Sequence, residues 1–250
     1  FSGVNLPWST TFDCYEWVQG QSLSCDSLAL AGGWTACGKG TEITSAANNP
    51  AGMGGRGARW WNGDGQNVNS GPLDISFNTP QKELYIRWYM RYQQGFKWNP
   101  LGYDKHWYVR TGTGGTDAIP EFSSEMYRIA AQNAAGGAAY GSNAAGWSAI
   151  MGGPQSDGRW HCYEIHLRMD TNGGDGVAEM WVDGAKKFSQ TNVNYSGGNS
   201  TARQGWVGTQ LNSNQNNPAN GTCMYVDYDD VAISTAGPVG PAGSSGGATV

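Results

Sequence analysis

Two short stretches of the sequence carry side chains that could do acid–base chemistry. Residues 87–92 read RWYMRY, and residues 105–110 read KHWYVR. Side chains of a strand alternate between its two faces, so each stretch would gather arginines and tyrosines on one side. That side holds Arg87, Tyr89 and Arg91 in the first stretch, and His106, Tyr108 and Arg110, opposite Lys105, in the second.

These are the residue types that β-elimination of a uronate needs. A cation or an amide neutralises the carboxylate, a base such as Tyr, His or Lys takes the neighbouring proton, and an acid protonates the leaving oxygen. A third stretch, residues 160–169, adds His166 as a catalytic candidate, with Glu164 and Arg168 as substrate-binding candidates on the same face.

The three polar faces allow two interpretations. If they line one sheet, they form a basic, aromatic surface suited to an acidic polysaccharide. Otherwise they are solvated faces of an antiparallel sheet, with the arginines paired to glutamates. Glycoside hydrolysis needs two facing carboxylates. The best pair, Glu164 and Glu179, has the spacing of an ordinary cross-strand salt bridge, so we rank hydrolysis below elimination.

Three tryptophans, Trp60, Trp61 and Trp98, occur in loop-like contexts. A flat indole ring there could stack on a sugar, or it could cover the core. We include all three as substrate-binding candidates.

Short alternating segments punctuated by Asn, Gly and Asp turns must position these residues. From Leu73 onward they predict an all-β fold, an antiparallel β-jelly-roll sandwich. We expect one domain over residues 1–236, with a loop-rich N-terminal head over residues 1–72. Residues 237–250 are rich in Gly and Pro and predict a tail or linker.

The composition excludes several classes of function. Only 14% of the 250 residues are charged and the net charge is -5, so no basic excess exists for nucleic-acid binding. No apolar run is long enough to span a membrane, and no fingerprint of an organic cofactor occurs. Abundant Asn, Ser, Gly and Trp with little Lys and Glu is typical of secreted carbohydrate-active proteins, so we expect secretion.

The five cysteines favour an oxidising compartment. They form no CxxC pair, which argues against zinc. We expect a disulfide between Cys25 and Cys37, and we consider a second that joins the head to Cys223.

Two regions resemble a known fold family. Residues 160–184, WHCYEIHLRMDTNGGDGVAEMWVDG, resemble the late hairpin of concanavalin-like, laminin-G-type jelly rolls, and CMYVDYDDVAIS at 223–234 resembles their last strand. Residues 83–110 resemble polysaccharide lyases of the alginate and glucuronan lyase kind. The resemblance implies a protein that acts on or binds polysaccharide, either a β-elimination lyase or a binding module derived from one.

The same resemblance implies a structural calcium ion. In concanavalin-like folds the first and last strands often lie close together and hold such an ion. Here Asp13, Asp227, Asp229 and Asp230 would supply the hard oxygen ligands that calcium prefers. The alternative is a solvated acidic edge.

A rival hypothesis concerns the tail. An extended segment can add to the open sheet edge of a neighbour through main-chain hydrogen bonds. The chain would then be a structural or adhesive subunit that assembles through residues 237–250.

Overall fold

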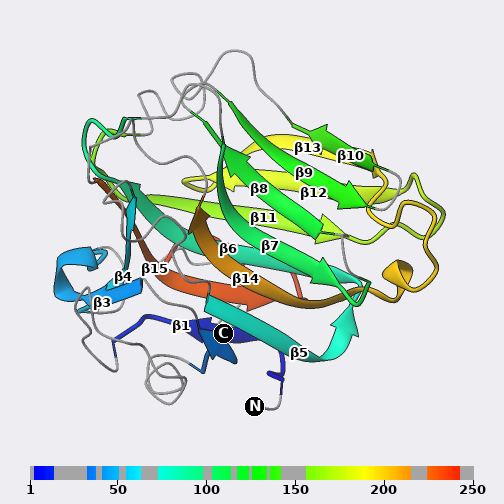
Figure 1. The fold of residues 1–250 in the computed structure, drawn as a ribbon, viewed down its shortest axis with the longest axis horizontal. Helices are drawn as coiled ribbons and strands as arrows, with labels where there is room; N and C mark the ends of the chain where they lie inside the picture. Colours follow the sequence, from blue (N-terminus) through cyan, green and yellow to red (C-terminus); the bar gives the residue numbers. More distant parts are fainter. Residues whose placement is uncertain are drawn as a thin grey trace.

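The computed structural model describes residues 3–13, 33–37, 41–50, 55–62, 73–97, 103–113, 117–123, 126–133, 136–141, 156–214 and 224–242. In these residues the chain forms two antiparallel sheets that pack face to face (Figure 1), which confirms the predicted jelly-roll sandwich. The remaining elements in this part of the chain are two short 3-10 helices, η1 (Ser45–Ala47) and η2 (Ala202–Gln204). No helix among the described residues is long and apolar enough to cross a membrane.

We name the sheets after β6 and β7, the strands that carry the two stretches of interest. The order of the β6 sheet is β13 (Ala185–Val193), β12 (Gly176–Val182), β11 (His161–Arg168), β6 (Glu83–Tyr92), β15 (Met224–Ser234), β4 (Gly57–Asn62) and β3 (Thr41–Thr44), with β1 (Trp8–Thr10) also paired to β15. The order of the β7 sheet is β10 (Gly136–Tyr140), β9 (Tyr127–Asn133), β8 (Asp117–Phe122), β7 (Asp104–Thr111), β14 (Trp206–Asn214), β5 (Leu73–Gln81) and β2 (Ala36–Cys37).

The alternating residues of β6 explain how the two sheets hold together. Leu84, Ile86, Trp88, Met90 and Tyr92 are all buried and face the other sheet. There the ring of Trp88 lies 5.9 Å from that of Trp107 on β7. Burying a large apolar side chain contributes about 1.5–3 kcal/mol, so the apolar half of each strand drives the sandwich and leaves the polar half outside.

Strands from the predicted loop-rich head complete one edge of the β6 sheet. β1 and β4 both pair with β15, and β3 pairs with β4. Trp60 and Trp61 therefore lie in a strand, and the loop context predicted for them is wrong.

Candidate functional site

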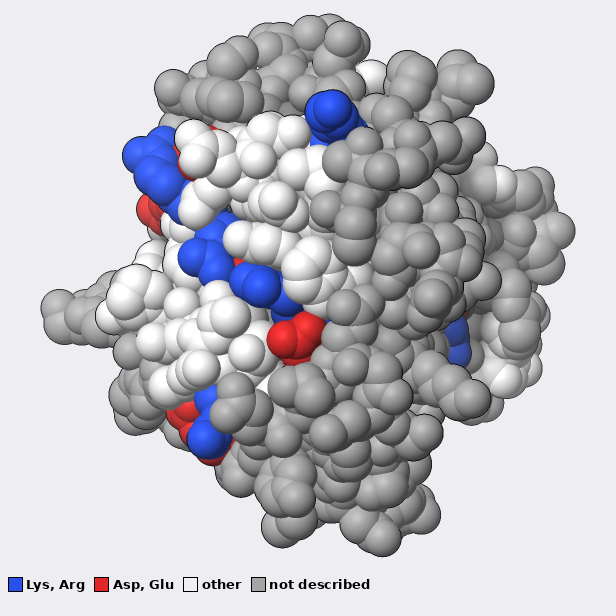
Figure 2. All heavy atoms as spheres, turned by 60° about the vertical axis from the view of Figure 1, so that its left-hand side comes forward, with Lys and Arg blue, Asp and Glu red and all other residues white. Residues whose placement is uncertain are grey.

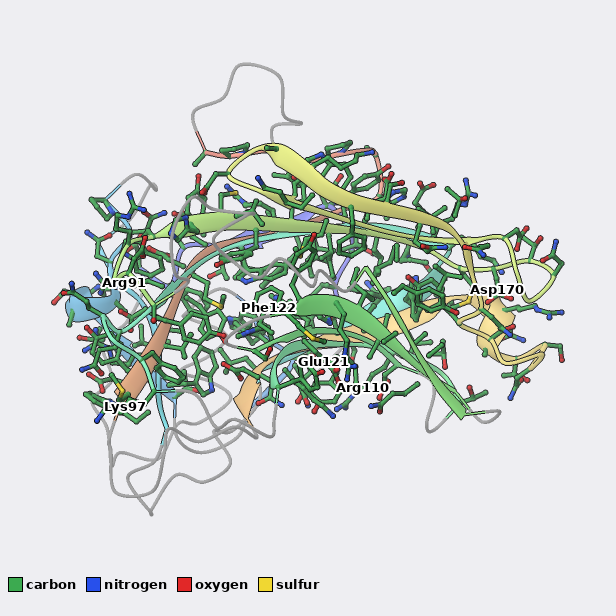
Figure 3. All side chains as sticks on the ribbon, turned by 90° about the horizontal axis from the view of Figure 1, so that it is seen from above. Arg91, Lys97, Arg110, Glu121, Phe122 and Asp170 are labelled. Atoms are coloured by element: carbon green, nitrogen blue, oxygen red, sulfur yellow. The ribbon has the colours of Figure 1, made fainter. Side chains whose placement is uncertain are left out.

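The two stretches lie in different sheets. β6 is flanked by β11 and β15, whereas β7 is flanked by β8 and β14. Because the sheets pack face to face, their outer faces point in opposite directions. In Figure 3, Arg91 belongs to the upper sheet and Arg110 and Glu121 to the lower one. The expectation that the arginine and tyrosine faces of both stretches line one surface is wrong.

His106 lies in the core, away from the outer face on which alternation placed it. The pairing of β7 with β8 is irregular between Lys105 and Val109, and consecutive residues His106 and Trp107 are both buried. A bulge of this kind shifts the alternation by one residue. Lys105 thereby joins Tyr108 and Arg110 on the outer side, while His106 points inward.

Two tyrosines from the β6 sheet hold the imidazole of His106. Nε2 lies 2.8 Å from the hydroxyl of Tyr92, and Nδ1 lies 2.7 Å from that of Tyr228. Burial lowers the pKa of His106 to about 3, so the ring is neutral at physiological pH. His106 therefore links the two sheets through polar contacts, and its burial prevents contact with a polysaccharide.

The outer face of the β7 sheet brings together the most complete set of chemical groups. The ring of Tyr108 has Lys105 Nζ 5.9 Å from its centroid and the Arg110 guanidinium 5.7 Å from it. Arg110 donates a 2.9 Å hydrogen bond to the amide oxygen of Gln210 on β14, and Gln210 Nε2 donates to Asp74 at 2.7 Å. A phenol, two cations and an amide thus share one small area.

Carboxylates complete this area, which we call the Tyr108 face: Tyr108, Lys105, Arg110, Gln210, Asp74, Asp117, Glu121, Arg128 and Tyr103. Glu121 is 3.7 Å from Lys105 and 2.6 Å from Arg128. The Arg128 guanidinium stacks 3.9 Å above the ring of Tyr103. Burial raises the pKa values of Asp74 and Asp117, and the nearby Arg110 opposes both shifts. The positive charge is therefore partly compensated within the face itself.

Sequence reasoning missed several members of the Tyr108 face. Gln210, Arg128 and Asp74 each lie on a strand that pairs with β7 or with a neighbour of β7. A register shift between Trp206 and Gly208 breaks the alternation in this strand, and no local pattern tells which distant strand lies beside β7.

On the outer face of the β6 sheet, His166 lies between two carboxylates. Its Nδ1 is 2.7 Å from Glu179 and its Nε2 is 2.7 Å from Glu83. The ring stacks on Tyr85 with 4.2 Å between centroids. Arg168 is exposed and donates to the backbone oxygen of Asp175 in the following turn. His166 is thus far from Tyr108, on the opposite side of the sandwich.

Asp227 is the shared counter-ion of two arginines. Its side chain is fully buried and accepts hydrogen bonds from Arg59 at 2.7 and 3.0 Å and from Arg91 at 2.6 and 2.9 Å. Burial raises the pKa of Asp227, and the two guanidiniums oppose that shift. From the sequence, Asp227 was expected to bind calcium and Arg91 to take part in β-elimination. In the structure Arg91 and Arg59 instead form ion pairs with Asp227.

Aromatic rings surround this ion pair. Arg59 lies 3.6 Å above Tyr225 and 5.5 Å from Trp61, and Arg91 lies 4.9 Å from Trp160. Trp61 also donates its Nε1 hydrogen to Glu42. Trp60 points the other way and is fully buried, which excludes it from stacking on a sugar. Trp98 lies outside the described residues.

The side of the molecule that carries β3 and β4 has no broad basic patch among the described residues. Figure 2 shows lysine and arginine side chains there in short, separate groups, most of which border acidic ones. The described residues on this side therefore form no continuous basic band.

Asp229 and Asp230 form a buried acidic pair. Asn49 donates its backbone hydrogen to Asp229 at 2.9 Å and its side-chain amide hydrogen to Asp230 at 3.1 Å. Burial, together with the neighbouring Asp230 and Asp13, raises the pKa of Asp229 to about 8. Asp13 itself accepts from the backbone amides of Gly55 and Arg56. The described residues contain no cluster of three or more His, Cys, Asp or Glu that could hold a metal ion.

The predicted disulfides fall outside what the structure describes. This applies to Cys14, Cys25 and Cys223, and to the side chain of Cys37. Cys162 on β11 is a buried free thiol whose pKa burial raises to about 12.

Comparisons with solved structures identify the fold. The alginate lyase Aly36B has 13% identity and a TM-score of 0.53, and the match covers 93% of this chain and 98% of that one. The alginate lyase vAL-1 from Chlorella virus has 14% identity and a TM-score of 0.56, and the match covers 87% of this chain and all of that one. The receptor binding domain of botulinum neurotoxin type G has 11% identity and a TM-score of 0.51, with coverage of 94% and 48%.

No model of a known protein family matches the sequence, and no curated protein does. The chain thus shares the jelly-roll fold of these lyases and of a toxin domain, and this confirms the resemblance expected from residues 83–110, 160–184 and 223–234.

Proposed function

We propose that this chain acts on an acidic polysaccharide at the Tyr108 face and cleaves it by β-elimination. The observation that carries the proposal is the placement of Tyr108 between Lys105 and Arg110, beside the amide of Gln210. Two neighbours of this fold are alginate lyases by name, and one was solved with an alginate trisaccharide. Their substrate supports a carbohydrate partner here, and the composition supports secretion.

Each group has a role that its chemistry allows. Arg110, with 44% of its side chain exposed, and Gln210 would neutralise the uronate carboxylate and so acidify the adjacent C–H bond. Tyr108, in its phenolate form, would take that proton and become a neutral phenol, and the released electron pair would form a carbon–carbon double bond as the glycosidic C–O bond breaks. The leaving oxygen takes up a proton, which Tyr108 or Lys105 can supply.

A second candidate is a binding module without catalysis. Lys105, Arg110 and Arg128 each have a carboxylate within 4 Å, so the face has fewer uncompensated cations than a lyase of a polyanion would use. Such a surface can still hydrogen-bond sugars.

Incubation with glucuronan, alginate and a neutral β-glucan separates the two candidates. We expect the ultraviolet absorbance of an unsaturated product with at least one uronan and none with the β-glucan. Retention on an insoluble glycan without product from any uronan would favour the binding module. Neither product nor retention would contradict both.

We also propose that the Asp229–Asp230 pair binds calcium. Two adjacent buried carboxylates would supply part of the all-oxygen shell that calcium takes. Burial and the neighbouring Asp230 raise the pKa of Asp229 to about 8, and a bound cation would offset both effects.

Calcium in excess over chelator should raise the melting temperature. At a concentration of about 100 Kd, binding to the folded state contributes about 2.7 kcal/mol, or roughly 5–10 °C for a chain of this size. Asp229→Asn should abolish the calcium dependence. Asp175→Asn, which neutralises an exposed acid in the turn after β11, should preserve it. Equal melting curves of the wild type with calcium and with chelator would contradict the proposal.

A further inference from the structure

The first part of the predicted tail is docked on the protein itself. Residues 237–242, which we call the strap, lie against the outer face of the β6 sheet. The backbone amides of Val239 and Gly240 donate to the two carboxylate oxygens of Glu164, at 2.7 and 2.9 Å. The amide of Ala242 donates to the hydroxyl of Tyr89 at 2.8 Å. In Figure 3 the end of the described chain, in faded red, runs along the outer side of this sheet.

The docking site was expected to hold substrate, and it holds a peptide instead. Glu164 is only 4% exposed and Tyr89 only 6%. Burial also raises the pKa of Tyr89 to about 12, so its hydroxyl stays neutral and accepts the amide of Ala242. The buried Nε of Arg87, directly opposite Glu164 across β6 and β11, has no hydrogen-bond partner. A buried pair of acceptors, Glu164 and Tyr89, and the buried donor of Arg87 thus lie together at this site.

The site recognises an extended backbone more than particular side chains. All three hydrogen bonds use backbone amides of the strap, and Val239 is the residue whose side chain becomes buried, at 7% exposure. Gly240 has a φ of +72°, a conformation that glycine adopts without strain. Pro241 lies against Gly184, where a Cβ would come within 3.4 Å of the proline ring. A Gly–Pro segment therefore fits this surface well.

The connection to the strap can open without disturbing the sheet. β15 ends at Ser234, and only residues 235–238 separate it from the docked Val239. Gly237 has a φ of +142°, and a Cβ built on it would meet nothing within 4 Å. When two copies exchange straps, each contact that is lost as a strap leaves its own copy forms again on the other copy. The equilibrium between monomer and exchanged dimer therefore depends on protein concentration.

We propose that Glu164 and Tyr89 form a docking site for the strap of a second copy, so that chains associate by exchanging straps. The partner is this chain itself, and the contact is made on a sheet face and not on the open edge considered from the sequence. The inference does not depend on the chemistry of the Tyr108 face, which lies on the other sheet.

Two full-length variants test the exchange by complementation. Val239→Pro removes one strap amide and the buried side chain but leaves the docking site intact. Glu164→Ala removes the docking carboxylate but leaves the strap intact.

Cys162 on β11, opposite Tyr89 in the register, reports whether the site is covered. Adding Cys162→Ser to the Glu164→Ala copy restricts the thiol signal to the Val239→Pro copy, and Val239→Pro with Cys162→Ser measures the background of the other cysteines.

We expect Cys162 in the Val239→Pro copy alone to react with a small thiol reagent about tenfold faster than in the wild type, because hydrogen bonds that hold the strap are lost. Mixing with the Glu164→Ala copy should slow the reaction again and produce a dimer in analytical ultracentrifugation. Glu83→Ala, a change on the same face away from the strap, should leave the rate at the wild-type value.

Two results would overturn the proposal. One is a wild-type rate of thiol modification in the Val239→Pro copy, which would mean that the strap does not cover the site. The other is a mixture of folded variants that remains monomeric with an unchanged thiol rate. If Glu164→Ala does not fold, Tyr89→Phe takes its place as the copy with a defective docking site and is judged by the same two outcomes.

Discussion

Tyr108→Phe should reduce the rate of β-elimination about 10²–10⁴-fold, the usual contribution of a positioned proton-transfer group. The substitution keeps the ring between Lys105 and Arg110 and removes only the hydroxyl. Binding of the polysaccharide should therefore change little, while kcat falls. The measurement is steady-state formation of the unsaturated product on whichever uronan the wild type cleaves, with affinity followed separately by retention on the glycan.

Tyr85→Phe is the matched control for this experiment. It makes the same chemical change on the outer face of the β6 sheet, where Tyr85 stacks on His166, and should leave the rate unchanged. If Tyr85→Phe abolishes activity and Tyr108→Phe does not, the active site lies on the β6 sheet and our assignment of the Tyr108 face is wrong.

Asp227→Asn should destabilise the fold more than any surface substitution. The change removes the negative charge that Arg59 and Arg91 share in a buried site. Leaving buried charges without a partner costs about 3–5 kcal/mol, which corresponds to a fall in melting temperature of roughly 10 °C in a chain of this length. Thermal unfolding followed by circular dichroism measures the change.

Asp74→Asn provides the comparison for a more exposed pair. Asp74 lies 3.9 Å from Arg110, and 27% of its side chain is exposed. Exposed pairs of this kind contribute about 0–1 kcal/mol, so the melting temperature should fall by a few degrees at most. Equal effects of the two substitutions would show that burial of Asp227 does not govern its contribution.

The alternating pattern of the two arginine–tyrosine stretches predicted the strands correctly. It did not predict which side chains would lie together in one site. Alternation correctly separated Arg87 and Arg91 from the buried Trp88 and Met90, because apolar burial acts residue by residue along a strand. It failed at His106, where a bulge between strands shifts the phase. A bulge depends on pairing with a partner strand, which local sequence does not reveal.

The sequence by itself determined the all-β fold, through period-two alternation and turn residues that act locally, and it determined which chemical groups the chain possesses. Only the tertiary structure decided which groups meet. Strands close in the chain, β6 and β7, went to opposite sheets, while Gln210 came beside Tyr108 and the strap came onto Glu164. The physical reason is that pairing and packing bury apolar surface between segments far apart in the chain, so the neighbours of each polar side chain follow from the global arrangement of strands.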